Sequence, residues 1–343
     1  MKDRKTRLRF PGLLFVLGAV LTVRPVSAEL IAKLPQVMKP FYMTMAGGRL
    51  YIVEDSSTAH IYAMGAKEVS FIKTFGREGQ GPGEFDFIYH IRVREDHLDI
   101  PGSHKLARFS LDGEYIDEVK LPIEVFKGGI YRLGENYLAK NVRLDYQEIT
   151  TTIRLYGKDF KLIKEIGSRK DSMGVEKINL VADYYSPRVV GDQIFVIDSG
   201  RESIVTVYDR DGVQQKEIRL PLEPAKMTAA LKEAILKPLR EDPEMKARWD
   251  AFEKRLYFPD YTPGLDYFEV VDGKFVTRTY TYREDLVEFA VFDLQGRELQ
   301  RMFLPHTGRL SSGIHFYFLQ GRFFYLRYNI EEDVWELHSE KVW

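Results

Sequence analysis

The apolar positions of this chain fall in short runs separated by turn residues, and one combination recurs. In three segments an aromatic residue is followed by glycine four positions later and by Leu-Pro at the twelfth and thirteenth positions. These segments are residues 109–122, 208–221 and 292–305. Glycine adopts a positive φ without steric cost, and proline cannot donate to a sheet. Each segment therefore predicts a β-hairpin followed by an exit loop.

Weaker copies of the hairpin fill the gaps at residues 61–76 and 153–167. A short β-rich run precedes each copy, and a further run lies near the C-terminus. These runs begin at Arg49, His97, Asn136, Gln193, Lys274 and Arg322. With one earlier inner strand per unit, the pattern gives four strands in each of six units and a period of roughly 47 residues. We predict an all-β fold, a six-bladed β-propeller with four-stranded antiparallel blades.

The two ends of the chain predict how the ring closes. The last hairpin has one further strand, at residues 334–342, so the sixth blade lacks its outer strand at the C-terminus. A strand-like stretch at residues 30–37 has no other assignment. We expect this N-terminal strand to pair with the last blade, because closure removes the open edges of a linear array.

Residues 224–257 interrupt the rhythm between blades four and five. Residues 228–239 have a helix-forming composition, and residues 242–244 read Asp-Pro-Glu, which is typical of a helix start. One apolar stripe at helical spacing follows: Met245, Trp249, Phe252 and Leu256. We expect a helical insert whose stripe packs on the rim of the propeller. A lid or a face that docks a partner is the alternative.

A glycine-rich sequence lies between the first and second predicted blades. Residues 74–85 read TFGREGQGPGEF. It resembles the blade-junction signature of NHL-repeat propellers and, more closely, the exported bacterial six-bladed β-propeller proteins related to them. The residues that carry the resemblance are Phe75, Gly76, Gly79, Gly81, Gly83, Glu84 and Phe85. A phosphate-binding loop is the alternative, but the stretch has no Gly-Lys-Ser/Thr ending and does not open a helix. We interpret it as a joint between blades.

The N-terminus predicts export. Basic residues between Lys2 and Arg9 precede an apolar run of eleven residues at 13–23, and small residues end at Ala28. This order is typical of a secretory signal peptide at residues 1–28, which leaves residues 29–343 as the propeller. An uncleaved anchor is the alternative, although the run is short for a membrane span. We expect a periplasmic or extracellular protein with no transmembrane segment in its mature chain.

Composition narrows the classes of partner. The chain has 50 Lys and Arg, 51 Asp and Glu, and no cysteine. Disulfides and thiolate chemistry are therefore excluded. Most charged residues of the predicted signal peptide are basic, so the mature chain is net acidic. A net acidic chain argues against a nucleic-acid ligand. We expect a monomer.

The sequence shows no catalytic motif. The seven histidines include no H-x-x-x-H or H-E-x-x-H pair, and no G-x-S-x-G elbow is present. We therefore predict no catalytic residue, metal ligand or cofactor, although scattered ligands for Ca²⁺ or Zn²⁺ in the channel are an alternative. Aromatic and basic residues near the predicted inner strands are the candidate binding residues: Tyr89, His90, Arg92, Tyr185, Tyr267, His315 and Tyr317.

Three functions are consistent with these features. The first is an exported noncatalytic module that binds a peptide, protein or glycan. The second is a lactonase-like hydrolase or a lyase with a channel-bound metal, as the resemblance to other six-bladed propellers implies. The third is an assembly subunit that docks through the helical insert. We favour the first and do not expect an enzyme.

Overall fold

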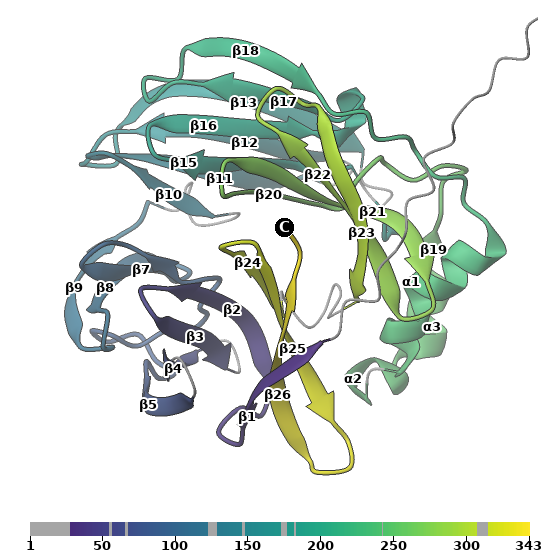
Figure 1. The fold of residues 1–343 in the computed structure, drawn as a ribbon. Helices are drawn as coiled ribbons and strands as arrows, with labels where there is room; N and C mark the ends of the chain where they lie inside the picture. The colour runs from purple at the N-terminus through teal and green to yellow at the C-terminus, as the bar shows by residue number, and fades with distance from the viewer. Residues whose placement is uncertain are drawn as a thin grey trace, which may run out of the picture.

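Six four-stranded antiparallel sheets follow one another along the chain in this computed structural model, as the hairpin rhythm predicts. The structure describes residues 28–54, 57–65, 68–122, 129–145, 148–172, 177–181, 183–241, 243–306 and 315–343. Figure 1 shows the sheets arranged as blades, with β24 near the middle of the view. The signal peptide predicted at residues 1–28 lies, apart from Ala28, outside the described residues.

The first three blades take up residues 40–172, and each starts with its innermost strand. Blade 1 consists of β2 (Pro40–Ala46), β3 (Arg49–Glu54), β4 (Thr58–Met64) and β5 (Val69–Phe75). Blade 2 consists of β6 (Arg92–Val93), β7 (His97–Pro101), β8 (Lys105–Ser110) and β9 (Tyr115–Lys120). Blade 3 consists of β10 (Ile130–Leu133), β11 (Asn136–Leu144), β12 (Glu148–Tyr156) and β13 (Leu162–Ser172).

The last three blades repeat this order. Blade 4 consists of β15 (Tyr185–Val190), β16 (Gln193–Asp198), β17 (Ile204–Tyr208) and β18 (Gln214–Arg219), with a 3₁₀ turn at Ser199–Arg201. Blade 5 consists of β20 (Tyr267–Val271), β21 (Lys274–Arg283), β22 (Leu286–Asp293) and β23 (Glu298–Pro305). Blade 6 consists of β24 (Phe316–Leu319), β25 (Arg322–Asn329), β26 (Val334–Lys341) and β1 (Glu29–Leu34).

The N-terminal strand closes the ring. Strand β1 pairs antiparallel with β26, with Glu29 opposite Ser339 and Leu34 opposite Trp335. Leu34 is buried in a core cluster that contains residues of both the first and the last blade. The predicted closure is confirmed, because the two ends of the chain share one sheet.

The hairpin glycines have a packing role that explains their recurrence. Gly113, Gly212 and Gly296 have φ values of +79°, +71° and +83°. A Cβ on each would come within 2.8, 2.6 and 2.7 Å of an isoleucine of the preceding blade. Each hairpin turn therefore lies directly against its neighbour, where a left-handed residue without a side chain is needed.

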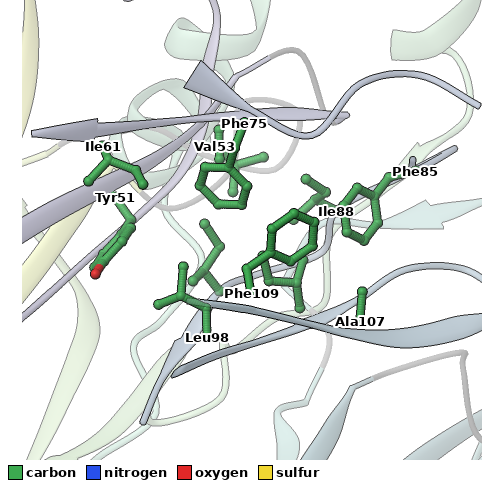
Figure 2. Packing of buried hydrophobic residues seen from close by; sticks show 12 residues of the cluster. Tyr51, Val53, Ile61, Phe75, Phe85, Ile88, Leu98, Ala107 and Phe109 are labelled. Atoms are coloured by element: carbon green, nitrogen blue, oxygen red, sulfur yellow. The ribbon is translucent and has the colours of Figure 1, made fainter. Parts of the chain in front are cut away.

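The glycine-rich segment is a joint between blades 1 and 2. Phe75 and Phe85 lie at its two ends and are buried in the cluster shared by these blades, where Phe109 contacts both rings (Figure 2). The ring centroids of Phe75 and Phe85 lie 5.1 and 5.9 Å from that of Phe109. Burial of these aromatics fixes the crossing, so the segment has the structural role expected of it.

The predicted helical insert lies between β18 and β20. It consists of α1 (Ala229–Glu241), α2 (Pro243–Lys246) and α3 (Trp249–Glu253), and a short parallel pair joins β14 (Ile178–Asn179) to β19 (Leu256–Tyr257). The helices lie together beside β19 and β21 (Figure 1).

The apolar stripe predicted for the insert is wrong as a single helical face. The chain turns between α2 and α3, and Leu256 belongs to β19. The insert packs on the propeller through α1 instead, where Ile235 is fully buried in a cluster with Val181 and Tyr280. Periodicity alone missed the turn at residues 247–248 that divides the stripe.

Among the described residues, no helix is long and apolar enough to cross a membrane.

Candidate functional site

A cavity of about 280 Å³ occupies the central channel, and all six blades contribute to its wall. Its lining comes from the innermost strands and from the connection that enters β6. The lining residues are Phe41, Tyr42, Met43, Tyr89, His90, Arg92, Tyr131, Arg188, Val189, Tyr267, Glu269, Phe316 and Tyr317. We call this space the channel cavity. Its walls are rigid because strands carry most of them.

The structure brings five of the seven candidate binding residues together in this cavity. They are Tyr89, His90, Arg92, Tyr267 and Tyr317. Tyr267 and Tyr317 lie at the starts of β20 and β24, while Tyr89 and His90 lie in the connection that precedes β6. Residues from three blades that are far apart in the sequence therefore share one wall.

Tyr185 and His315 lie elsewhere. Tyr185 packs in the cluster between blades 3 and 4. Its hydroxyl comes so close to Gly167 that a Cβ there would lie 2.3 Å away. His315 is buried, and its Nε2 lies 2.7 Å from the carbonyl oxygen of Pro40. His315 therefore links blade 6 to blade 1 as a hydrogen-bonded residue of the wall.

Sequence reasoning missed the ion pair in the wall of the channel cavity. The Nε of Arg188 on β15 donates to Glu269 of β20 over 2.8 Å. Its Nη2 donates to the hydroxyl of Tyr184 over 2.9 Å, and its Nη1 lies 3.4 Å from that of Tyr131. All three guanidinium nitrogens of Arg188 thus have protein partners. A charged residue within a short inner strand was the available signal.

Arg92 differs from Arg188 in its partners. Its Nε donates to the carbonyl oxygen of Ile130 over 2.9 Å, and its guanidinium carbon lies 3.6 Å from the centroid of the Tyr131 ring. This stacking fixes the guanidinium plane. Within the described ranges Arg92 makes no ion pair with a carboxylate. It is therefore a positioned cation at the cavity wall.

His90 presents a nitrogen without a partner. Its Nε2 is buried and has no hydrogen-bond partner among the described residues, and its ring lies edge-on to Tyr42 at 6.3 Å. Burial, and then the charges of Arg92 and Arg188, hold the pKa of His90 well below its ordinary value, although a backbone hydrogen bond at Ile130 opposes them. The imidazole is therefore neutral near pH 7, and since its other ring nitrogen donates at the Ile130 backbone, Nε2 can accept one further hydrogen bond.

Five tyrosines line the channel cavity, and three of them are buried in a way that shifts their pKa values. Burial raises the pKa values of Tyr42 and Tyr317, and it raises the pKa of Tyr267 well above its ordinary value. The hydroxyls therefore stay protonated near pH 7. Each can donate and accept, while the ring offers an apolar face.

A larger cavity, of about 700 Å³, lies beside the insert. We call it the insert cleft. Its lining residues are Asn179, Val181, Asp183, Ser199, Gly200, Glu202, Ser203, Arg219, Leu220, Pro221, Leu222, Glu223, Pro224, Pro259, Tyr261, Thr262, Pro263 and Gly264. None of the candidate binding residues lines it. Arg219 pairs with Glu202 at 3.1 Å, and both side chains are 67% exposed.

Metal-ligating groups are sparse along the channel cavity. Of its lining residues, His90 and Glu269 have the right side chains, but Glu269 is engaged by Arg188. In the part of the chain that the structure describes, no group of three or more His, Asp or Glu side chains lies close enough to hold an ion. Asp171, Asp183 and Asp198 do converge, but on the guanidinium of Arg169.

No curated protein matches the chain. Among solved structures, the chain is similar to a luciferin-regenerating enzyme at 12% identity and a TM-score of 0.43, which covers 93% of this chain and 97% of that one. It is similar to the Pan2 WD40 domain of Neurospora crassa at 8% identity and a TM-score of 0.44, over 92% and 95% of the two chains. Likeness at this level carries no argument about ligand or activity. A family model described as "6-bladed beta-propeller" matches residues 39–151.

Proposed function

We propose that this chain is an exported, noncatalytic binding module whose channel cavity holds part of a peptide, protein or glycan. The observation that carries the proposal is the buried Nε2 of His90, which has no partner among the described residues, in a wall that also holds the guanidinium of Arg92. A buried polar group without a partner costs free energy. A ligand that supplied the missing partners would recover part of that cost.

The state of the ionisable groups favours binding over catalysis. General acid–base chemistry needs a carboxylate or imidazole free to exchange a proton with the ligand. Glu269 is held by Arg188, and the ring of His90 lies beside that of Tyr42, with no carboxylate of the described residues to orient it. The cavity offers hydrogen-bond donors and aromatic faces, which suit recognition.

Export rests on the order of residues in the leader. The basic start, the apolar run at residues 13–23 and the small residues ending at Ala28 are the features of a cleaved signal peptide. A relation to NHL-repeat propellers is supported by the glycine-rich joint at residues 74–85. We propose a monomer that works in the periplasm or outside the cell.

A ligand screen on purified residues 29–343 tests the proposal. Peptides and oligosaccharides are ranked by thermal shift, and hits are measured by calorimetry with Tyr42→Ala and a control, Tyr328→Ala, on the exposed face of β25. We expect Tyr42→Ala to weaken binding about tenfold or more, while the control binds as the wild type does. Equal binding by both variants would place the ligand outside the channel.

Metal analysis separates this proposal from the hydrolase or lyase alternative. The protein is equilibrated with Ca²⁺ or Zn²⁺, desalted and analysed by mass spectrometry. The binding proposal predicts less than one equivalent of either metal. One tightly bound equivalent that His90→Ala removes, together with turnover of a lactone, would overturn it.

A further inference from the structure

Three charged side chains line the channel cavity, Arg92, Arg188 and Glu269. Arg188 and Glu269 neutralise each other through a hydrogen bond of 2.8 Å. Arg92 has no carboxylate partner in the described residues, and the other lining residues are uncharged near pH 7. The cavity therefore carries one uncompensated positive charge, which favours an anionic group on the ligand.

The geometry of Arg92 favours a planar anion. Its Nε is occupied by the carbonyl oxygen of Ile130, and its flat face lies on the Tyr131 ring. The two terminal nitrogens have no protein partner among the described residues. A guanidinium held in this way presents parallel N–H groups, which match the two oxygens of a carboxylate.

The remaining free polar groups suit hydroxyls. The rings of His90 and Tyr42 lie 6.3 Å apart in the lining, and the Nε2 of His90 has no partner among the described residues. Nε2 can accept from a ligand hydroxyl, and the hydroxyl of Tyr42 can donate or accept. A ligand ammonium would need a carboxylate, but Glu269 is engaged by Arg188. A free amino acid therefore fits less well than a hydroxylated acid.

The size and the aromatic lining of the cavity agree with a single ring. A volume of about 280 Å³ is just below the range of small-molecule sites, which runs from roughly 300 to 1,000 Å³. The faces of the lining tyrosines can cover the apolar face of a pyranose. A longer chain would extend out of the channel.

We infer that the channel cavity binds the acidic ring of a saccharide that contains a uronic acid, with the ring carboxylate on the guanidinium of Arg92. The inference rests on the proposed function and names its ligand class. The carboxylate replaces the missing counterion of Arg92, and ring hydroxyls bond to His90 and Tyr42.

Calorimetry with matched saccharides tests the inference. The probes are a galacturonic acid trisaccharide, its methyl ester, and the neutral galactose trisaccharide. We expect the acid to bind roughly 10- to 100-fold more tightly than the ester or the neutral sugar. Arg92→Gln should remove this preference, and Arg92→Lys should restore it only in part. The control is Arg327→Gln on the exposed side of β25.

The outcomes separate the inference from the proposed function. If the acid and its ester bind equally, or if Arg92→Gln keeps the preference, the inference is wrong and glycan binding stands. If only peptides with a free C-terminal carboxylate bind, the inference is also wrong. If no saccharide or peptide binds the wild type, both proposals fail. The ester comparison needs no variant, so a folding defect in Arg92→Gln cannot obscure the result.

Discussion

The channel cavity is smaller than the insert cleft, yet its wall is built more from strands and its cation is less compensated. The insert cleft is larger, but loops carry much of its wall, and its cation Arg219 pairs with Glu202 in solvent. The channel cavity is smaller, but strands carry most of its wall, and its cation Arg92 has no carboxylate partner among the described residues. Volume alone would favour the insert cleft, whereas polar groups with unused hydrogen-bonding capacity on strand-borne walls favour the channel cavity, which is the site that we propose.

The largest expected difference between the two regions is in the free energy of unfolding that is lost when each ion pair is broken. Arg188→Ala would leave Glu269 without its partner in the channel wall, and we expect a loss of about 2–4 kcal/mol in the free energy of unfolding. Arg219→Ala in the insert cleft should cost less than about 1 kcal/mol, because solvent screens that pair. Urea unfolding of both variants measures the difference.

A double variant separates the charge from the packing of Arg188. With Glu269→Gln added, the unpaired carboxylate is gone, so part of the loss should return. If Arg188→Ala and Arg219→Ala cost the same, the ion pair of the channel is no more sheltered than that of the cleft.

Local stability should also differ between the two regions. Ile235 on α1 anchors the insert through a small cluster, so Ile235→Ala should destabilise the insert by about 2 kcal/mol or more. Because α1 packs against β21 and not against the innermost strand of blade 5, we expect faster hydrogen exchange in α1 and α3, with little change at β20. Equal acceleration at β20 would show that the insert and the channel wall unfold together.

The architecture could be predicted from the sequence because its signals are local. The hairpin glycines, the closing prolines and the strand at residues 30–37 each report on a neighbouring turn or edge. Gly113 illustrates why: its φ of +79° and its contact with the preceding blade both require glycine. A repeat also supplies the same signal several times.

The candidate site could be predicted only in part. Residues such as Tyr267 and Tyr317 were found because inner strands converge on the channel, whatever the details of packing. The ion pair of Arg188 and Glu269 joins residues far apart in the sequence, and no local pattern shows which strands face each other across a channel. The insert cleft was missed because it depends on loop conformation.

Lys140 tests how the protein tolerates a buried positive charge near Arg188. Burial, and then the charge of Arg188, lower the pKa of Lys140 to about 8, against the opposing effect of Asp171. Lys140→Met should therefore stabilise the protein by about 1–2 kcal/mol at pH 7. The gain should vanish as pH rises from about 8 to 10.5, because the unfolded lysine then loses its proton as well. Lys232→Met on α1 is the matched control, and thermal unfolding across this pH range measures both.

The smallest expected effect concerns His90. Its folded pKa is held well below 6.5, so the unfolded chain takes up a proton at mildly acidic pH before the folded protein does. The proton therefore favours unfolding, and stability should fall as pH drops below about 6.5. His90→Gln should remove up to about 1 kcal/mol of this loss between pH 6.5 and 5.5. Chemical unfolding at the two pH values gives the slope. An unchanged slope in His90→Gln would mean that the imidazole takes up its proton in the folded protein too, and it could then add a second positive charge beside Arg92.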